Sequence, residues 1–397
     1  MSLKNLLNLP FCVLLMLIIV LLFGDNIPLA AKSNLYSLSL FLKDVIICVL
    51  PVLIFSLVWT GILNLKGESV KIVLILIPLV CVSNFLGMWV SYIFTAPILD
   101  SGVITISELV QNNALSPAWK LPIPRFVSND VALVFGFILG LSGNFIRIPI
   151  LDIISRKLLR VTNFILKRVI YSVLPLFILG FIIKMQHEDS LLMIIKDYSK
   201  LLVIVAILAY GYMFSVMHFL LCGRKIRTTI EKFKNLIPSI LIGFFSMSSA
   251  AAIPSTIGGT KKNLKNNDLA GFIIPAAANM HLLGDCFALP IIGLSIMISF
   301  GFGLPDISQY FIFTIYGVIA KFAAAGIPGG SALIFAPLFE NVFEFSAPML
   351  TAVTAIYILF DPVATSANVF GHGMFALLFE KVHGWVCWEK KRQNSKT

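Results

Sequence analysis

The sequence has few charged residues: Asp, Glu, Lys and Arg together make up 12% of its 397 residues. It is 58% hydrophobic, with a mean hydropathy of +0.96. Many apolar runs reach roughly 20 residues, the length at which a helix crosses the hydrocarbon core of a bilayer. The scarcity of charge therefore excludes a soluble globular protein and predicts an all-α polytopic membrane protein.

The motifs of metal sites, disulfide frameworks and hydrolytic enzymes are also missing. The six cysteines include no C-x-x-C pair and lie mostly in apolar runs, so we interpret them as small buried hydrophobic residues. The sequence has no H-E-x-x-H motif, no nucleophile elbow and no pair of catalytic carboxylates. We therefore expect neither an enzyme nor a cofactor.

Acidic residues are scarcer than basic ones, with 19 Asp and Glu against 30 Lys and Arg, which gives a net charge of +11. In a soluble protein this excess favours nucleic-acid binding. Here the basic residues fall in short loops, which is typical of cytoplasmic loops and leaves no room for a nucleic-acid-binding domain. We expect no nucleic-acid partner, a lipid bilayer around the chain, a bacterial inner (plasma) membrane location and cytoplasmic N- and C-termini.

Apolar runs and their interruptions predict about eight transmembrane helices and two re-entrant helical hairpins. The first run, 10–31, is interpreted as an uncleaved span because no clean A-x-A site follows it. The charge-balanced segment 184–200 is expected to be an extracellular loop. The expected ranges are spans 1 and 2 in 1–71, span 3 in 72–98, an extracellular segment with spans 4 and 5 in 99–200, span 6 with a basic cytoplasmic loop in 201–234, hairpin 1 in 235–268, span 7 in 269–302, hairpin 2 in 303–350, span 8 in 351–382 and a cytoplasmic tail in 383–397.

Two apolar segments near the C-terminus are interrupted where a bilayer span is continuous. SMSSAAAIP (246–254) breaks the first, and Gly and Pro residues at 326–330 break the second. Broken helices at membrane depth are tolerated only where they are buried or line a cavity, and a pair of them points to a transporter binding site. Polar residues inside the two neighbouring spans are functional candidates by default: Asn279, His281, Asp285, Asp361, Asn368 and His372.

The order hairpin, polar span, hairpin, polar span resembles the dicarboxylate/amino acid:cation symporters, the glutamate-transporter-like family. The resemblance covers most of the chain and is closest to the bacterial serine/threonine transporter branch. It rests on SSAAAIP (248–254), Asn279-Met280, GIPGGSALIF (326–335) and the spacing from Asp361 to His372. It implies a glutamate-transporter-like fold, a homotrimer and an elevator mechanism. In that mechanism spans 3 and 6 to 8 and the hairpins form the transport domain, and spans 1, 2, 4 and 5 form the scaffold.

The resemblance also implies a set of substrate-binding residues. Asp361 stands where amino-acid transporters of the family bind the substrate α-amino group, and Asn368 stands where an amide binds the α-carboxylate. Thr365 matches a threonine that helps form the site. The two hairpin tips complete the set, with the second tip as the gate: Ser248, Ser249, Ile327, Pro328 and Gly329. Half-helix N-termini that converge on an anionic carboxylate agree with the direction of the helix dipole.

One departure from the family pattern bears on the substrate. Ala364 occupies the position where carriers of acidic substrates have Arg. Without a guanidinium group there is no evident partner for a side-chain carboxylate. Asp361 as an amine partner also argues against dicarboxylates, which carry no amine. A small neutral amino acid fits best.

A second departure bears on the coupling ion. His281 and His372 fall where the family keeps two aspartates as sodium ligands, although Na⁺ prefers oxygen ligands. Either protons replace some sodium ions, with histidine titrating near pH ~6.5, or sodium coupling is altered. Asp285 lies four residues after His281, on the same face of the expected helix, and either pairs with it or supplies the missing carboxylate. Both histidines, Asn279 and Asn368 also suit simple interhelical hydrogen bonding.

The sequence therefore predicts a secondary active transporter for a small neutral amino acid, coupled to Na⁺ or H⁺. Candidate cation- or proton-binding residues are Asn279, His281, Asp285, Asn368 and His372, with no metal expected beyond a possible Na⁺. The alternatives are symport of a C4-dicarboxylate or acidic amino acid, an uncoupled anion conductance, and a carrier-like protein that has lost transport.

Overall fold

The structure is a computed structural model of the 397-residue chain. It describes residues 9–63, 70–101, 115–121, 123–124, 127, 129–145, 149–165, 168, 171–188, 191–323 and 329–394. These residues form helices and no strand, so the expected all-α class is confirmed.

The helices follow the expected order along the chain. The first half contains α1 (Leu9–Phe23), the short η2 (Gly24–Asn26), α2 (Leu29–Leu63), α3 (Val70–Asp100), α4 (Asn129–Phe145), α5 (Pro149–Phe164), α6 (Tyr171–His187) and α7 (Leu191–Ser215). The second half contains η4 (Val216–Leu221), α8 (Ile226–Ser246), α9 (Ser249–Lys261), α10 (Asp268–Met280), α11 (Leu283–Ser299), α12 (Ile307–Ala320), η5 (Lys321–Ala323), α13 (Gly330–Phe343) and α14 (Ala347–Asn394).

Long apolar helices give the fold its membrane character. Four segments of the described residues are long and apolar enough to cross a bilayer: Leu74–Asp100, Tyr198–Leu221, Asp268–Ser299 and Ala347–Gly384. Several shorter apolar helices accompany them, including α13 and most of α6. The segment Asp268–Ser299 is the most deeply buried of the four, since 94% of its 18-residue apolar stretch is buried inside the protein. This burial places α10 and α11 at the centre of the fold.

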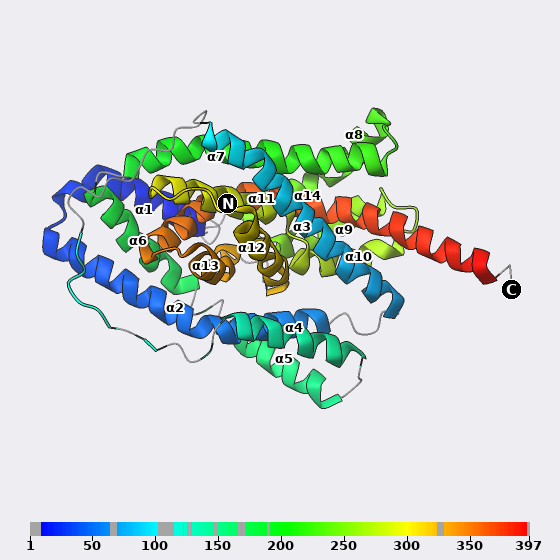
Figure 1. Cartoon of the computed structure of the whole chain (residues 1–397), viewed down its shortest axis with the longest axis horizontal. Helices are drawn as coiled ribbons and strands as arrows, with labels where there is room; N and C mark the ends of the chain where they lie inside the picture. The colour runs from blue at the N-terminus through cyan, green and yellow to red at the C-terminus, as the bar shows by residue number, and fades with distance from the viewer. Residues whose placement is uncertain are drawn as a thin grey trace.

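The helices form two groups. In the first, α2 packs against α4, α5 and α6, and α1 packs against α6. In the second, α14 packs against α7, α8, α9, α10, α11 and α13, while α3 packs against α11 and α12. Figure 1 shows α2, α4 and α5 along one long side, and the end of α14 extending beyond the other helices. The hairpins α8–α9 and α12–α13 both belong to the second group.

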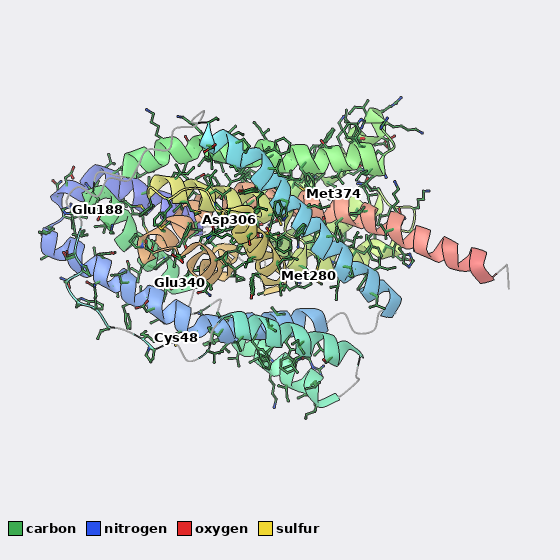
Figure 2. All side chains as sticks on the ribbon, viewed as in Figure 1. Cys48, Glu188, Met280, Asp306, Glu340 and Met374 are labelled. Atoms are coloured by element: carbon green, nitrogen blue, oxygen red, sulfur yellow. The ribbon has the colours of Figure 1, made fainter. Side chains whose placement is uncertain are left out.

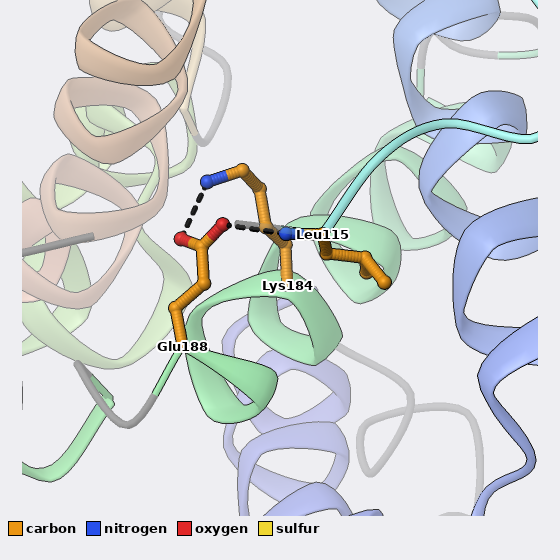
Figure 3. A network of polar contacts seen from close by, with 3 residues as sticks. All are labelled: Leu115, Lys184 and Glu188. Atoms are coloured by element: carbon orange, nitrogen blue, oxygen red, sulfur yellow. Dashed lines mark hydrogen bonds and ion pairs between the residues drawn. The ribbon is translucent and has the colours of Figure 1, made fainter. Parts of the chain in front are cut away.

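The extracellular loop that we expected at 184–200 is wrong, because helices occupy most of that segment. Helix α6 continues to His187 and α7 begins at Leu191. Two of the charges that suggested a loop are buried and paired: Lys184 Nζ lies 2.5 Å from Glu188 Oε2, one turn away. Glu188 Oε1 also accepts a hydrogen bond from the Leu115 backbone N–H at 3.1 Å (Figure 3). The pair thus holds the segment that precedes α4 against the end of α6.

Span 7, which we expected at 269–302, contains a break. Helix α10 ends at Met280 and α11 begins at Leu283. A break at membrane depth needs a partner for the backbone groups that it leaves unpaired. Asn84 of α3 supplies one, since its Nδ2 donates to the Met280 carbonyl at 2.8 Å. Met280 is labelled in Figure 2, among the central helices.

Small residues allow the central helices to touch. A Cβ atom on Gly284 of α11 would lie 2.0 Å from the Ala364 carbonyl oxygen of α14. A Cβ atom on Gly259 of α9 would lie 2.3 Å from the Asn235 carbonyl oxygen of α8. Without a hydrophobic driving force between helices in lipid, such close backbone contact is what stabilises their packing.

Candidate functional site

The tip of hairpin 1 is a sharp turn between α8 and α9. Met247 adopts a left-handed conformation with φ 49°, and Ser248 then begins α9 as its N-cap. The Ser248 hydroxyl accepts a hydrogen bond from the Ala251 N–H at 3.3 Å, as an N-cap residue does. Ser249 is buried. The two predicted serines therefore lie at the start of α9, where the helix dipole is positive.

The tip of hairpin 2 lies between η5 and α13. Ile327 and Pro328, both predicted substrate contacts, lie outside the described residues. Gly329 is described and has φ 71°, a conformation that glycine adopts without steric cost. Helix α13 begins immediately after it, at Gly330. Gly329 is thus the described residue at the end of the tip, and its contacts with neighbouring helices are known.

Asp361 of α14 lies directly against this tip. Its side chain is 2% exposed. Oδ2 accepts a hydrogen bond from the Gly329 N–H at 2.7 Å, and Oδ1 accepts one from the Thr365 hydroxyl at 2.6 Å. The structure therefore brings together three predicted residues from two separate elements.

Asp285 of α11 forms a second carboxylate centre. Its Oδ1 accepts hydrogen bonds from the Tyr357 hydroxyl at 2.8 Å and from Asn368 Nδ2 at 3.0 Å, and its Oδ2 accepts one from the Ser331 hydroxyl. Asn368 also accepts from the Asp285 N–H at 3.3 Å, so both ends of its amide are engaged. The predicted residues Asp285 and Asn368 thus form one unit that links α11 to α13 and α14.

In the described part of the chain, both carboxylates accept hydrogen bonds from neutral donors alone. No Lys, Arg or His in the described residues forms an ion pair with Asp285 or Asp361. A buried carboxylate without a cationic partner is costly in membrane surroundings, and amide and hydroxyl donors compensate only in part. The arrangement is therefore suited to receive a cation or a proton.

Sequence reasoning missed two of the residues that hold Asp285. Ser331 follows the GIPGG turn directly, in the first turn of α13. Tyr357 lies four residues before Asp361 on α14, one helical turn away. The spacing of Tyr357 from Asp361 was available as a signal for a shared helix face.

The two histidines meet in a separate cluster, next to the break between α10 and α11. His281 Nε2 lies 2.8 Å from the Ser83 hydroxyl of α3, and its ring centroid lies 4.3 Å from that of Phe375. The His372 ring interacts with the His281 backbone. Nδ1 of His281 and Nε2 of His372 are buried without a hydrogen-bond partner among the described residues.

Two expectations about this cluster need correction. His281 and Asp285 do not share a face of one helix, because the break separates them. No hydrogen bond between their side chains occurs in the described part of the chain; His281 contacts Ser83 and Phe375 instead. In those residues no group of three or more His, Cys, Asp and Glu side chains is arranged to hold a metal ion.

Asn279 is not brought into either centre by a hydrogen bond. Its side chain is exposed, and its Nδ2 donates to the Pro275 carbonyl of its own helix at 3.3 Å. It is the residue before Met280, where α10 ends, and α3 residues bond to Met280 and His281 at the break instead.

Lys321 is a further residue that sequence reasoning missed. It is 1% exposed, in η5 at the end of the first arm of hairpin 2, and its Nζ has no hydrogen-bond partner among the described residues. The Nζ atom lies 4.5 Å from the centroid of the Phe335 ring. A single lysine inside the apolar run that leads to GIPGG was a readable signal, since intramembrane charges are rare.

Comparison with known families agrees with this geometry. A family model described as the sodium:dicarboxylate symporter family matches residues 9–382. The chain belongs to this family. It is therefore a transporter rather than an enzyme, and an integral multi-pass membrane protein.

Curated proteins named serine/threonine transporters align with this chain over most of its length. The serine/threonine transporter SstT of Acinetobacter baumannii (strain AYE) is 24% identical over 373 residues, which cover 89% of this chain and 92% of that protein. The serine/threonine transporter SstT of Acinetobacter baylyi is 26% identical over 361 residues, covering 81% and 84%. The protein of the same name from Streptococcus thermophilus is 24% identical over 288 residues, covering 71% and 68%.

Proposed function

We propose that this protein is a cation-coupled symporter of a small neutral amino acid, working by an elevator mechanism. The observation that carries the proposal is the Asp361 carboxylate, which is buried beneath the second hairpin tip and, among the described residues, accepts hydrogen bonds from the Gly329 N–H and the Thr365 hydroxyl alone. An α-ammonium group is the complementary partner for such a carboxylate, and charge-assisted bonds of this kind are the strong ones. The names of the serine/threonine transporters support the same substrate class.

The surroundings of Ala364 support a neutral side chain on the substrate. Ala364 is fully buried, and its carbonyl oxygen faces Gly284 of α11. No cationic side chain is paired with Asp285 or Asp361 in the described residues, and Ala364 supplies none at the position where carriers of acidic substrates have Arg. Acidic amino acids and dicarboxylates are accordingly poor substrates in this proposal.

The hydrogen bond between Gly329 and Asp361 gives the gate its role. It places the tip of hairpin 2 on the atom that binds the substrate amine. Substrate must therefore displace or share this contact, so tip position and substrate binding depend on each other. This dependence is the coupling that an elevator requires before its transport domain moves.

For the coupling ion, we propose the proton. His281 Nδ1 and His372 Nε2 are two buried protonatable atoms without a hydrogen-bond partner among the described residues, and the His372 side chain contacts the His281 backbone. An imidazole can carry a proton on either ring nitrogen, and it is a poor ligand for a hard cation. Asp285 remains the carboxylate available to Na⁺ if sodium is the coupling ion.

Three further features complete the proposal. Helices α3 and α7 to α14 form the transport domain, and helices α1, α2, α4, α5 and α6 form the scaffold. The protein assembles as a homotrimer through its scaffold. It lies in a bacterial inner membrane with both termini in the cytoplasm, as the basic loops indicate.

The decisive experiment is uptake into proteoliposomes that contain the purified protein. Labelled neutral amino acids, acidic amino acids and C4-dicarboxylates are each supplied with a pH gradient alone and with a Na⁺ gradient alone. We expect uptake of a neutral amino acid driven by the pH gradient and lost in His372→Ala. Uptake of a dicarboxylate alone contradicts the substrate assignment, and uptake driven only by Na⁺ contradicts the proton assignment.

The matched control distinguishes coupling from folding. His383, on the same helix and eleven residues beyond His372, stacks on Phe379. His383→Ala is expected to keep full uptake. Exchange of internal for external substrate in His372→Ala liposomes then shows whether the variant still binds substrate: exchange without accumulation is the result expected of a lost coupling site.

A further inference from the structure

A hollow at the far end of the transport domain lies apart from the substrate site. Its volume is about 560 Å³, within the range typical of small-ligand sites. Its walls come from α8, the turn between α9 and α10, the start of α10 and the distal part of α14. Figure 1 shows these parts of α8 and α14 at the same end of the molecule.

Three lysines from three elements line this hollow. They are Lys232 of α8, Lys265 of the turn between α9 and α10, and Lys381 of α14. None of them forms an ion pair with any described residue. Three ammonium groups around one concavity raise its positive potential and its affinity for anions.

The carboxylate in the hollow does not neutralise this charge. Glu380 accepts a hydrogen bond from the Asn266 backbone N–H at 2.7 Å, which ties the turn to α14. Three positive charges against one negative charge leave the described lining with a net positive charge. His383 also lines the hollow.

Hydrogen bonds fix the walls of the hollow. Asn263, 6% exposed, donates to the Lys232 carbonyl at 2.9 Å and accepts from Asn235 at 2.8 Å. Lys381 donates one bond to the Leu220 carbonyl at 2.6 Å, which holds its ammonium group at the rim while leaving its other two protons available. The hollow is therefore a formed site and not a chance approach of mobile chains.

We infer that this hollow binds a phosphate group, either the headgroup of an anionic lipid or a soluble phosphate compound. Lysine is a common phosphate ligand because it is a compact point charge with three donors. Basic pockets between helices on the cytoplasmic side of membrane proteins bind anionic headgroups. A bound phosphate joins hairpin 1 to α14 and so stiffens one end of the transport domain.

The test is thermal unfolding of the full-length protein in neutral detergent, followed by intrinsic fluorescence. The probes are inorganic phosphate, chloride at matched ionic strength, short-chain phosphatidylglycerol and short-chain phosphatidylcholine. We expect a saturable rise in Tm of about 2 to 5 °C with phosphatidylglycerol or phosphate, and no rise with chloride or phosphatidylcholine. A rise with phosphatidylglycerol alone identifies a lipid site, and a rise with both identifies a site for phosphate in general.

Two sets of variants make the test specific. Lys232→Gln with Lys265→Gln removes two of the three ammonium groups and keeps the Lys381 bond to Leu220, so folding is preserved. Lys234→Gln with Lys262→Gln removes the same charge from exposed positions of hairpin 1 outside the hollow. We expect the first pair to abolish the rise and the second to keep it. An equal loss in both pairs, or no rise in the wild type, overturns the proposal; neither result bears on substrate transport.

Discussion

At the scale of single residues, the proposed role of the negative charge on Asp361 is to bind the substrate ammonium group. Its hydrogen bonds to Gly329 and Thr365 do not need that charge. Asp361→Asn keeps the size of the side chain and an oxygen for the Gly329 N–H, but it removes the charge that an ammonium group needs. A hydrogen bond to a charged group contributes about 1.5–3 kcal/mol, so we expect substrate affinity to fall roughly 10- to 100-fold. Equilibrium binding of labelled substrate to the purified protein measures this change.

Asp268 provides the control for this substitution. It is an exposed carboxylate in the first turn of α10, away from the second hairpin tip. Asp268→Asn should leave the binding constant unchanged. If the two variants bind substrate equally well, Asp361 does not hold the amine, and its hydrogen bond to Gly329 has only a structural role.

Lys321 raises a question of stability. An unpaired buried ammonium group costs several kcal/mol, whereas its contact with the Phe335 ring contributes about 2 kcal/mol at most. We therefore expect Lys321→Met, which keeps most of the volume, to raise Tm by about 2 to 5 °C. Lys321→Ala should lower Tm because it leaves a cavity. Fluorescence-monitored unfolding in detergent measures both, and a fall in Tm in the Met variant means that the ammonium group has a stabilising partner.

At the scale of elements, the contact between α11 and α14 sets the geometry of the site. A Cβ atom on Gly284 would lie 2.0 Å from the Ala364 carbonyl oxygen, so Gly284→Ala must push the helices apart. Asp285 is the next residue and bonds to Asn368 of α14, so this shift separates the pair. We expect a loss of about 1–3 kcal/mol in stability and a fall in uptake of at least tenfold.

The same substitution on α10 supplies the comparison. A Cβ atom on Gly271 meets nothing within 4 Å, and the residue is exposed. Gly271→Ala should leave uptake unchanged and leave Tm equal or slightly higher, because alanine favours helix by up to about 1 kcal/mol. Equal uptake in Gly284→Ala and Gly271→Ala contradicts the assigned role of the α11–α14 contact.

Local sequence chemistry predicted the hairpins and the polar face of α14, but it did not predict how the breaks are stabilised. Gly, Pro and Ser interrupt apolar runs visibly at 246–254 and 326–330. The break after Met280 carries no such signal, because the residue that satisfies its carbonyl, Asn84, lies on α3, far away in the sequence. The loop expected at 184–200 failed for a related reason: Lys184 and Glu188 neutralise each other, which composition does not show.

The candidate site shows the same division. The motif spacing along α14 was enough to select Asp361, Thr365 and Asn368, which the structure then places in two carboxylate centres. The motif spacing did not show that Asn368 contacts Asp285, because this contact depends on how α11 and α14 cross. The sequence therefore predicted which residues of one helix belong to the site, but it did not predict the contacts between helices.

At the scale of the whole molecule, the outward faces of the two helix groups should differ in what covers them. Phe135 and Ile138 of α4 are 57% and 53% exposed, on the side of the molecule that Figure 1 shows as α2, α4 and α5. In the proposed homotrimer the scaffold packs against other copies, so we expect Phe135→Gln with Ile138→Gln to dissociate trimers into monomers. Mass photometry of the protein in detergent measures the distribution of masses.

Helix α7 offers a matched pair of side chains in the other group. Val203 and Ile207 are 56% and 64% exposed, and the proposed transport domain faces lipid there instead of another copy. Val203→Gln with Ile207→Gln exposes a similar polar surface, so it should leave the trimer intact. If the α7 pair dissociates the oligomer and the α4 pair does not, the helices assigned to scaffold and transport domain are exchanged. If the wild-type protein is itself a monomer, the scaffold makes no contact with other copies, and the proposed homotrimer is wrong.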